Sequence, residues 1–224
     1  PLLSNLLLDE LDRELEKRGH RFVRYADDVS IYVRPEAAGQ RVMTSLEQFL
    51  KKKLRLKVNR TKSAVGRPWK RTLLGYSFTA HRETKLKVSN SSLKRLKAKL
   101  REVTRTGRGR NLARTIGTLT PVIRGWMAYY CLAEVRGSFK QLDQWLRRRL
   151  RSILWRQWKR RWTRFRGLTR RCIADQRAWT SVSNGHGPWW NAGASHMNQA
   201  VPTSAFRQIG LLSFSELHSR LQPS

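Results

Sequence analysis

Hydrophobic residues near the start of the chain switch from helical to strand spacing. Leucines stand at every fourth position from Leu3 through Leu7 to Leu15, which predicts one apolar stripe along a helix that ends near Gly19. Residues 22–33 are rich in β-branched and aromatic residues, and an acidic interruption in their middle predicts a hairpin.

The pattern then returns to helix and again to strand. Pro35 fits the first turn of a second helix. Alternating apolar residues at 54–58, and the run at 72–79, predict two further strands. Residues 1–80 are therefore predicted to form an α+β layer. The inward positions of the second helix are Ala38, Val42, Leu46 and Leu50.

Beyond residue 80 the spacing becomes helical. Leu93, Leu96 and Leu100 mark a helix that Ser89 or Ser91 could cap. Residues 111–132 and 138–162 predict two more helices. After about Gly167 the periodicity fades, so an all-helical region at 81–180 is expected to precede a loop-rich tail at 181–224, in which only the last dozen residues indicate a short helix.

The charge distribution changes this picture most in the helical region. The 224 residues hold 47 Lys and Arg against 15 Asp and Glu, a formal net charge of +32. Residues 81–180 carry +23 of that total, whereas residues 1–80 carry +8. Such a cationic surface repels itself unless a polyanion binds. Nucleic acid is the leading candidate, and an anionic membrane surface is a weaker one.

Several protein classes are excluded. The sequence contains no run of 18 apolar residues, so it predicts no membrane span. Its first residues include Asp9 and Glu10 and do not resemble a secretory signal. Cys131 and Cys172 form neither a zinc pair nor a disulfide framework, so a reducing, intracellular and cytoplasmic setting is expected. Because the chain begins with Pro1, we expect a C-terminal fragment of a longer protein.

The most specific chemical signal is the acidic pair Asp27-Asp28 between two strand-forming runs. Adjacent carboxylates repel unless a positive charge lies nearby. Oxygen ligands on a hairpin suit Mg²⁺, which keeps several waters and shares phosphates with a substrate. An acidic turn without chemistry is the alternative interpretation of the same pair.

Residues 25–28, Tyr-Ala-Asp-Asp, resemble with their flanks the catalytic signature of reverse transcriptases. Residues 1–5 are similar to the end of the segment that contacts template and incoming nucleotide. Residues 56–63 resemble the next palm motif, and residues 73–76 the primer-grip hairpin.

Later motifs point to one group of reverse transcriptases. Residues 123–126 with Tyr129-Tyr130, the run at 145–162, and residues 187–190 resemble the thumb and maturase region of group II intron-encoded proteins. The resemblance implies a partial palm followed by a helical thumb and maturase domain. It implies an RNA-directed DNA polymerase that binds intron RNA and assists splicing and retromobility. The alternative is a non-enzymatic RNA-binding splicing factor, or an inactive remnant.

The resemblance also implies roles for single residues and partners. Asp27 and Asp28 would be catalytic and would bind Mg²⁺, with Asp27 the stronger candidate ligand. Lys62 could reach a nucleotide phosphate or pyrophosphate, or simply end a strand in solvent. Tyr25 could touch the primer end or pack beneath the hairpin, and Leu74, Gly75 and Tyr76 would belong to the grip, with the same ambiguity for Tyr76. The partners would be intron RNA, RNA template, DNA primer and dNTP.

The family's active site takes a third aspartate from an earlier strand, and this sequence starts after it. We therefore expect that the chain alone does not polymerise DNA and needs a palm and fingers half supplied in addition. No Cys-x-x-Cys or His-Asn-His cluster follows the maturase region, so the DNA endonuclease of some relatives is not expected.

Arginines and tryptophans alternate in the basic region. Guanidinium groups suit phosphate oxygens and stack on bases, so the cations predict RNA contacts. In a regular helix Trp155, Trp158 and Trp162 would share one face, where they could either pack inward or stack on bases. The residues predicted to bind RNA are Arg124, Arg147, Arg148, Arg149, Arg151, Arg156, Lys159, Arg160 and Arg161.

Overall fold

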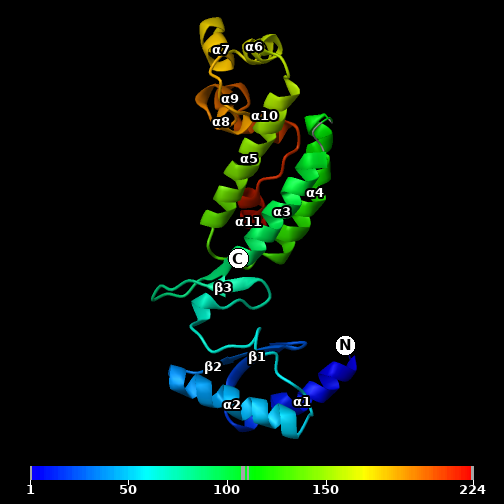
Figure 1. The fold of residues 1–224 in the computed structure, drawn as a ribbon, viewed down its shortest axis with the longest axis vertical. Coiled ribbons are helices and arrows are strands. Elements are labelled where there is room, and N and C mark those ends of the chain that lie inside the picture. The colour runs from blue at the N-terminus through cyan, green and yellow to red at the C-terminus, as the bar shows by residue number, and fades with distance from the viewer. Residues whose placement is uncertain (1, 107–108, 110, 223–224) are drawn as a thin grey trace. The chain divides into compact units, whose positions relative to one another are not determined.

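The structure, a computed structural model, describes residues 2–106, 109 and 111–222. Pro1, the first residue of the segment similar to the template contact, lies outside them. The chain divides into two compact units, Pro1–Thr84 and Lys85–Ser224, and its class is mixed α+β with mostly helices (Figure 1).

The first unit is built on a hairpin and two helices. Strands β1 and β2 pair antiparallel, with Tyr25 opposite Asp28 and Arg21 opposite Tyr32. The hairpin expected within residues 22–33 and both helices are therefore confirmed. The elements are α1 (Leu2–Lys17), β1 (Arg21–Tyr25), β2 (Asp28–Tyr32), α2 (Glu36–Lys52), a short 3₁₀ helix (Pro68–Lys70) and β3 (Tyr76–Phe78).

A small apolar core joins the hairpin to both helices. Its buried residues are Leu8, Leu11 and Leu15 of α1 and Leu46 of α2. One face of the hairpin packs on them, since Phe22, Val29 and Ile31 contribute half-buried side chains. Val42 and Leu50 also pack there, which agrees with the inward face predicted for α2.

The leucine stripe predicted for the first helix is only half right. Leu11 and Leu15 are buried, but Leu3 is 82% exposed and Leu7 is 42% exposed. Leu8 faces the core in place of Leu7. A stripe at strict four-residue spacing drifts around a helix of 3.6 residues per turn, so its early members lie off the buried face.

Of the two further strands predicted for the first unit, one is absent and the other is only partly formed. Residues 54–58 form no strand, and Arg55 has a positive φ of 53° that breaks the extended conformation. Leu54 and Leu56 nevertheless pack against the core. The run at 72–79 contains a tight turn at Leu74-Gly75, so only β3 and a single bridge at Leu73 remain extended.

The second unit is helical after one short strand. In Figure 1, α3, α4 and α5 run alongside one another, and α11 returns against α4 and α5. Buried apolar residues such as Leu100, Ile123 and Leu146 form its core. The elements are β4 (Leu86–Val88), α3 (Asn90–Thr106), α4 (Leu112–Tyr129), α5 (Gly137–Gln157), α6 (Arg161–Thr169), α7 (Asp175–Val182), α8 (Pro188–Asn191), α9 (Ser195–Ala200), α10 (Thr203–Gln208) and α11 (Phe214–Leu221).

The predicted helix at 138–162 is interrupted. Helix α5 ends at Gln157, and Trp158 leaves the helical conformation with φ −78° and ψ 72°. Its indole then lies against the backbone of Gly167 in α6, where a Cβ atom would come within 2.8 Å of the ring. Trp155, Trp158 and Trp162 therefore do not share a face of one helix.

The short helix expected in the last dozen residues is confirmed by α11, but the rest of the expected loop-rich tail is wrong for the described residues, because α8 to α10 lie within 188–208. The helices α8 to α10 have only four to six residues each. Helices this short give too few turns for apolar periodicity to reveal them.

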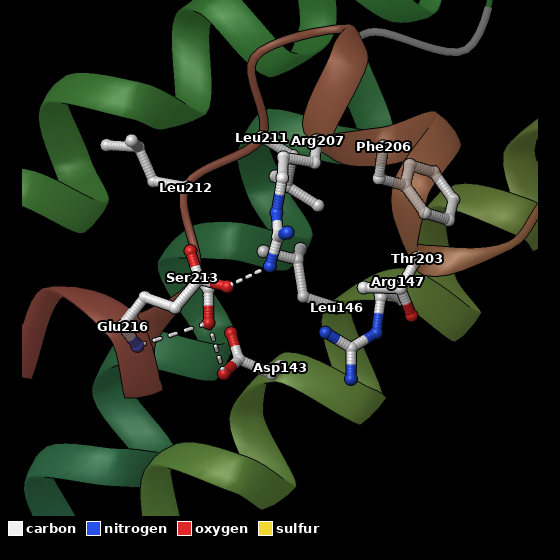
Figure 2. A pocket seen from close by; sticks show the side chains of 10 residues that line it. All are labelled: Asp143, Leu146, Arg147, Thr203, Phe206, Arg207, Leu211, Leu212, Ser213 and Glu216. Atoms are coloured by element: carbon white, nitrogen blue, oxygen red, sulfur yellow. Dashed lines mark hydrogen bonds and ion pairs between the residues drawn. The ribbon is translucent and has the colours of Figure 1, made fainter.

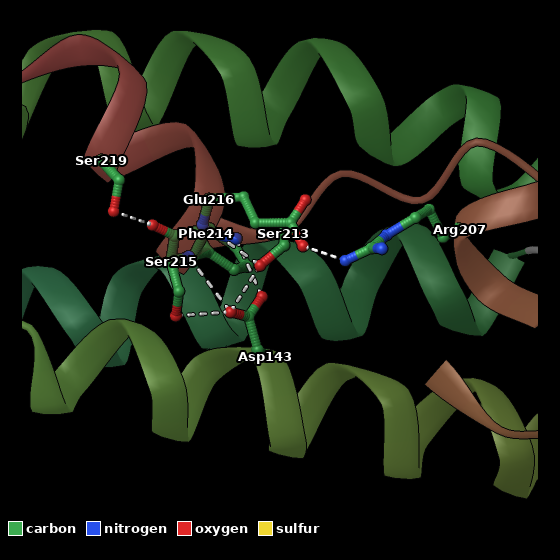
Figure 3. Close-up of polar contacts among 7 residues, drawn as sticks. All are labelled: Asp143, Arg207, Ser213, Phe214, Ser215, Glu216 and Ser219. Atoms are coloured by element: carbon green, nitrogen blue, oxygen red, sulfur yellow. Dashed lines mark hydrogen bonds and ion pairs between the residues drawn. The ribbon is translucent and has the colours of Figure 1, made fainter. Parts of the chain in front are cut away.

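A buried carboxylate fixes the last helix to α5 (Figure 3). Asp143 is 6% exposed, and it accepts hydrogen bonds from the backbone N–H groups of Phe214 and Ser215 at 2.8 and 3.1 Å. The hydroxyls of Ser213 and Ser215 also donate to it. The negative charge therefore meets the positive end of the α11 dipole and satisfies its first amide donors.

We predict that Asp143→Ala lowers the free energy of unfolding by about 2–4 kcal/mol, because hydrogen bonds to a charged group are lost and buried amides are left without an acceptor. Asp175→Ala, in the exposed first turn of α7, is the matched control and should cost about 0.3–1 kcal/mol. Denaturant unfolding measures both, and equal losses would contradict this role for Asp143.

Candidate catalytic hairpin and nucleic-acid interface

The acidic pair lies at a two-residue hairpin turn. Tyr25 and Asp28 are the last paired residues, so Ala26 and Asp27 form the turn. Ala26 has a φ of 52°, and a positive φ at only the first central position defines a type II′ turn, where glycine is usual. An alanine in this conformation costs on the order of 1–2 kcal/mol, so the surrounding structure has to hold the turn.

Arg24 supplies that support. Its Nε and Nη2 atoms donate to both carboxylate oxygens of Asp12 on α1, at 2.8 and 2.6 Å. Its Nη1 atom donates to the carbonyl oxygen of Ala26 and to Asn5 Oδ1, each at 3.1 Å. The hydrogen bond to Asp12 raises the pKa of Arg24 above its ordinary value. One guanidinium therefore ties the strained turn to α1.

The two faces of the hairpin differ. Phe22 and Arg24 lie on the face that meets the helices, whereas Val23, Tyr25 and Asp28 alternate onto the other face. Tyr25 is 62% exposed, so it is not packed beneath the hairpin, and that alternative is excluded. Asp27 lies at the tip of the turn, and both aspartates are exposed.

The carboxylates of the pair have no ion-pair partner within the described ranges, unlike three of the acids of α1. Asp12 pairs with Arg24, and Asp9 and Glu14 pair with Arg13 and Arg18 of their own helix. Three of the five acids of α1 are therefore paired with arginines, and Glu10 and Glu16 form no ion pair in the described part of the chain.

Among the described residues no group of three or more His, Cys, Asp and Glu side chains could hold a metal ion. Asp27 and Asp28 offer exposed oxygen ligands next to each other. This donor set fits Mg²⁺, which takes one or two carboxylates and completes its shell with water and substrate phosphates.

The other predicted palm residues lie in separate loops. Lys62 is exposed in a turn organised by Asn59, whose Oδ1 atom accepts from the backbone N–H groups of Thr61 and Lys62. Leu74 and Gly75 both have positive φ, 51° and 78°, which defines a type I′ turn. Tyr76 closes that turn through paired backbone hydrogen bonds with Leu73.

The predicted RNA-binding cations fall into an exposed and an anchored group. Arg148 donates to the carbonyl oxygen of Trp189, and Arg149 donates to Thr104 Oγ1. Arg151 is only 7% exposed and donates to the carbonyl oxygen of Val201. Arg147 belongs to neither group, because it is half-buried and has no hydrogen bond to another described residue. The exposed members are Arg124, Arg156, Lys159, Arg160 and Arg161.

The tryptophans divide in the same way. Trp155 is 1% exposed and belongs to the core, whereas Trp162 is 54% exposed. Trp162 stacks on Phe165 at a centroid distance of 5.2 Å, and Phe165 stacks on Trp179 at 4.6 Å. An aromatic cluster with accessible edges therefore lies on α6 and α7, directly after the cations 159–161.

No helix in the described part of the chain is both long and apolar enough to cross a bilayer.

Comparison with known families agrees with both halves of this description. Residues 1–78 match the reverse transcriptase (RNA-dependent DNA polymerase) family model. Residues 93–172 match the model of the group II intron maturase-specific domain. The chain belongs to the group II intron reverse transcriptase and maturase family. No curated protein matches it. The family resemblance predicted from residues 25–28 and from the later Trp and Arg motifs is therefore confirmed.

Some structurally important residues of this reverse transcriptase and maturase chain were not predicted from the sequence. Arg24 lies three residues before Asp27, and an arginine inside a short, partly apolar strand is a signal that a buried partner exists. Trp179 and Trp189 gave no such signal, because their neighbours in space lie on other helices.

We predict that Arg24→Met speeds amide hydrogen exchange across β1 and β2 by about tenfold or more, since it leaves Asp12 unpaired and the turn untied. The double variant Arg24→Met/Asp12→Leu should recover part of the loss, because no charge is then left unpaired. Arg13→Met, which breaks an exposed pair with Asp9, is the control and should change exchange little. Equal effects of Arg13→Met and Arg24→Met would contradict the anchoring role.

Proposed function

We propose that the first unit is part of a reverse transcriptase palm, in which Asp27 and Asp28 are the catalytic carboxylates. The observation that carries this proposal is an exposed acidic pair on a strained turn that Arg24 holds in place. A turn without chemical function could use glycine at Ala26 and avoid the strain. Tyr25 lies opposite Asp28 on the exposed face, where it would meet the primer end.

The same acids would hold Mg²⁺, with Asp27 at the tip as the first ligand and Asp28 beside it. Bound there, the ion would favour the deprotonated form of a primer 3′-hydroxyl and neutralise charge on the leaving pyrophosphate. The chain's own contribution is to fix the two carboxylates through Arg24. Lys62 and the turn at 74–76 would contact nucleotide and primer.

Two carboxylates on one hairpin are fewer than a two-ion site needs, and Asp9, Asp12 and Glu14 of α1 are already paired. We therefore propose that polymerisation requires a further carboxylate from a complementing palm and fingers segment. RNA template, DNA primer and dNTP would be bound by the completed assembly.

We predict that the chain alone yields no cDNA in primer extension on an RNA template with Mg²⁺. Addition of a palm and fingers segment from a related protein should give synthesis that Asp27→Asn or Asp28→Asn reduces by at least about 10³-fold. Asp175→Asn, far along the chain in α7, is the control and should leave synthesis unchanged. Robust cDNA from the chain alone, lost on Asp27→Asn, would contradict the need for a further ligand.

The second unit would bind intron RNA through its exposed cations. Lys159 and Arg160 lie between α5 and α6, Arg161 begins α6, and the aromatic cluster of Trp162 and Trp179 follows. Arginine with accessible aromatic rings suits phosphate contacts together with unpaired bases. This unit would assist the folding of the intron for splicing. The free thiols of Cys131 and Cys172 fit a reducing intracellular compartment, which stays a prediction.

We predict that affinity for group II intron RNA falls steeply with salt. Replacing Lys159, Arg160 and Arg161 by Gln should reduce the slope of log K against log salt by about 2–3, since each lost phosphate contact removes 0.7–0.9. The same replacement at Lys51, Lys52 and Lys53 removes equal charge from the first unit and should change the slope less. Fluorescence anisotropy measures both, and equal changes would contradict a dedicated surface on the second unit.

A further inference from the structure

A cavity of about 280 Å³ lies in the second unit between α5 and the segment from α8 to α10. Arg147, Arg148 and Arg151 of α5 contribute to one side, since residues three and four apart share a helix face. Gly193, Asn198 and Thr203 line the other side. None of the residues that line it is acidic.

Arg148 is anchored at this cavity by two contacts with Trp189. Its Nε atom donates to the carbonyl oxygen of Trp189 at 3.1 Å, and its Cζ atom lies 4.6 Å from the centre of the Trp189 ring. It also lies close to Gly193, where a Cβ atom would come within 2.7 Å of Cζ. A side chain at residue 193 would therefore displace the Arg148 guanidinium from its place beside the Trp189 ring.

Arg151 is the buried cation of the set. It is 7% exposed, its Nε atom donates to the carbonyl oxygen of Val201 at 2.9 Å, and it lies 5.5 Å from the Phe206 ring. It forms no ion pair with any carboxylate in the described part of the chain. Burial, and then the charge of Arg147, lower the pKa of Arg151 to about 10. A buried cation without a counter-ion is unfavourable unless a ligand supplies one.

The acids near Arg147 are already engaged (Figure 2). A smaller adjoining pocket, which Arg147 and Thr203 also line, contains Asp143 and Glu216. Asp143 accepts hydrogen bonds from the first turn of α11, and Glu216 pairs with Arg207. Arg147 itself forms no hydrogen bond or ion pair with another described residue, so its guanidinium is available to a ligand.

We infer that this cavity is a phosphate-binding site. The inference rests on the proposed RNA-binding function, in which the ligand is one phosphodiester group of the bound RNA. Guanidinium forks bind phosphate oxygens in pairs, and Asn198 and Thr203 add neutral polar groups. Free phosphate offers the same oxygen atoms, and the experiment separates the two sources.

The first arm uses inorganic phosphate as the probe on the full chain. Isothermal titration at constant ionic strength, adjusted with chloride, should detect binding that Arg147→Gln weakens by about tenfold, the effect of one lost charge-assisted contact. Gly193→Ala should weaken it similarly through Arg148 while keeping every charge. Lys140→Gln removes one charge from an exposed position of α5 and should leave phosphate binding unchanged. Circular dichroism confirms that each variant is folded.

The second arm measures affinity for group II intron RNA. Arg147→Gln and Gly193→Ala should each lower it about five- to tenfold more than Lys140→Gln. If phosphate binding responds as expected but RNA affinity does not, the site takes free phosphate and the RNA source is overturned. If Arg147→Gln and Gly193→Ala leave phosphate binding unchanged, the site itself is overturned, whatever RNA does. If the unmodified chain fails to bind RNA while phosphate binds, the proposed RNA function fails and the phosphate site stands.

Discussion

The fold of the second unit has to accommodate many arginine side chains with few carboxylates to pair with them. Its ion pairs in the described part are Lys99–Glu102 and Arg207–Glu216. Arginines use backbone carbonyl oxygens and aromatic rings in their place. Arg164 donates to the carbonyl oxygen of Trp158 and lies over the Trp155 ring, and Arg171 donates to Gly167. These contacts satisfy hydrogen-bond donors without neutralising charge, so the fold keeps a cationic surface that an RNA backbone can neutralise.

The first unit uses the opposite arrangement at its hairpin. There Arg24 meets a carboxylate in a bidentate pair, and the remaining donor reaches the carbonyl oxygen of Ala26. The carboxylate of Asp12 is paired with Arg24 in this anchor, whereas Asp27 and Asp28 stay exposed. The acids near the hairpin therefore divide into Asp12, which holds the turn, and Asp27 and Asp28, which stay exposed for the proposed chemistry.

The sequence predicted well wherever a pattern extended over several turns or a motif was local. The long helices α1 to α4, the hairpin and the acidic pair at its turn are of this kind. The predictions failed where a distant contact decides local structure. Trp158 ends α5 because its ring packs on Gly167 of the next helix, and no local signal in the sequence marks that break. Residues 54–58 alternate as a strand would, yet they pack on the core without a partner strand. The cavity of Arg147, Arg148 and Arg151 could not be predicted, because Gly193 and Thr203 approach only through short helices with no periodic signature.

Cations of the second unit, at residues 159–161 and at the α5 cavity, are the groups proposed to contact the RNA. Hydrogen exchange of the full chain with and without group II intron RNA locates that contact, since bound RNA slows amide exchange where it covers backbone. We expect protection from the end of α5 to the start of α6 and around Gly193, with residues 51–53 unchanged. Tight RNA binding with protection confined to the first unit would contradict this proposal.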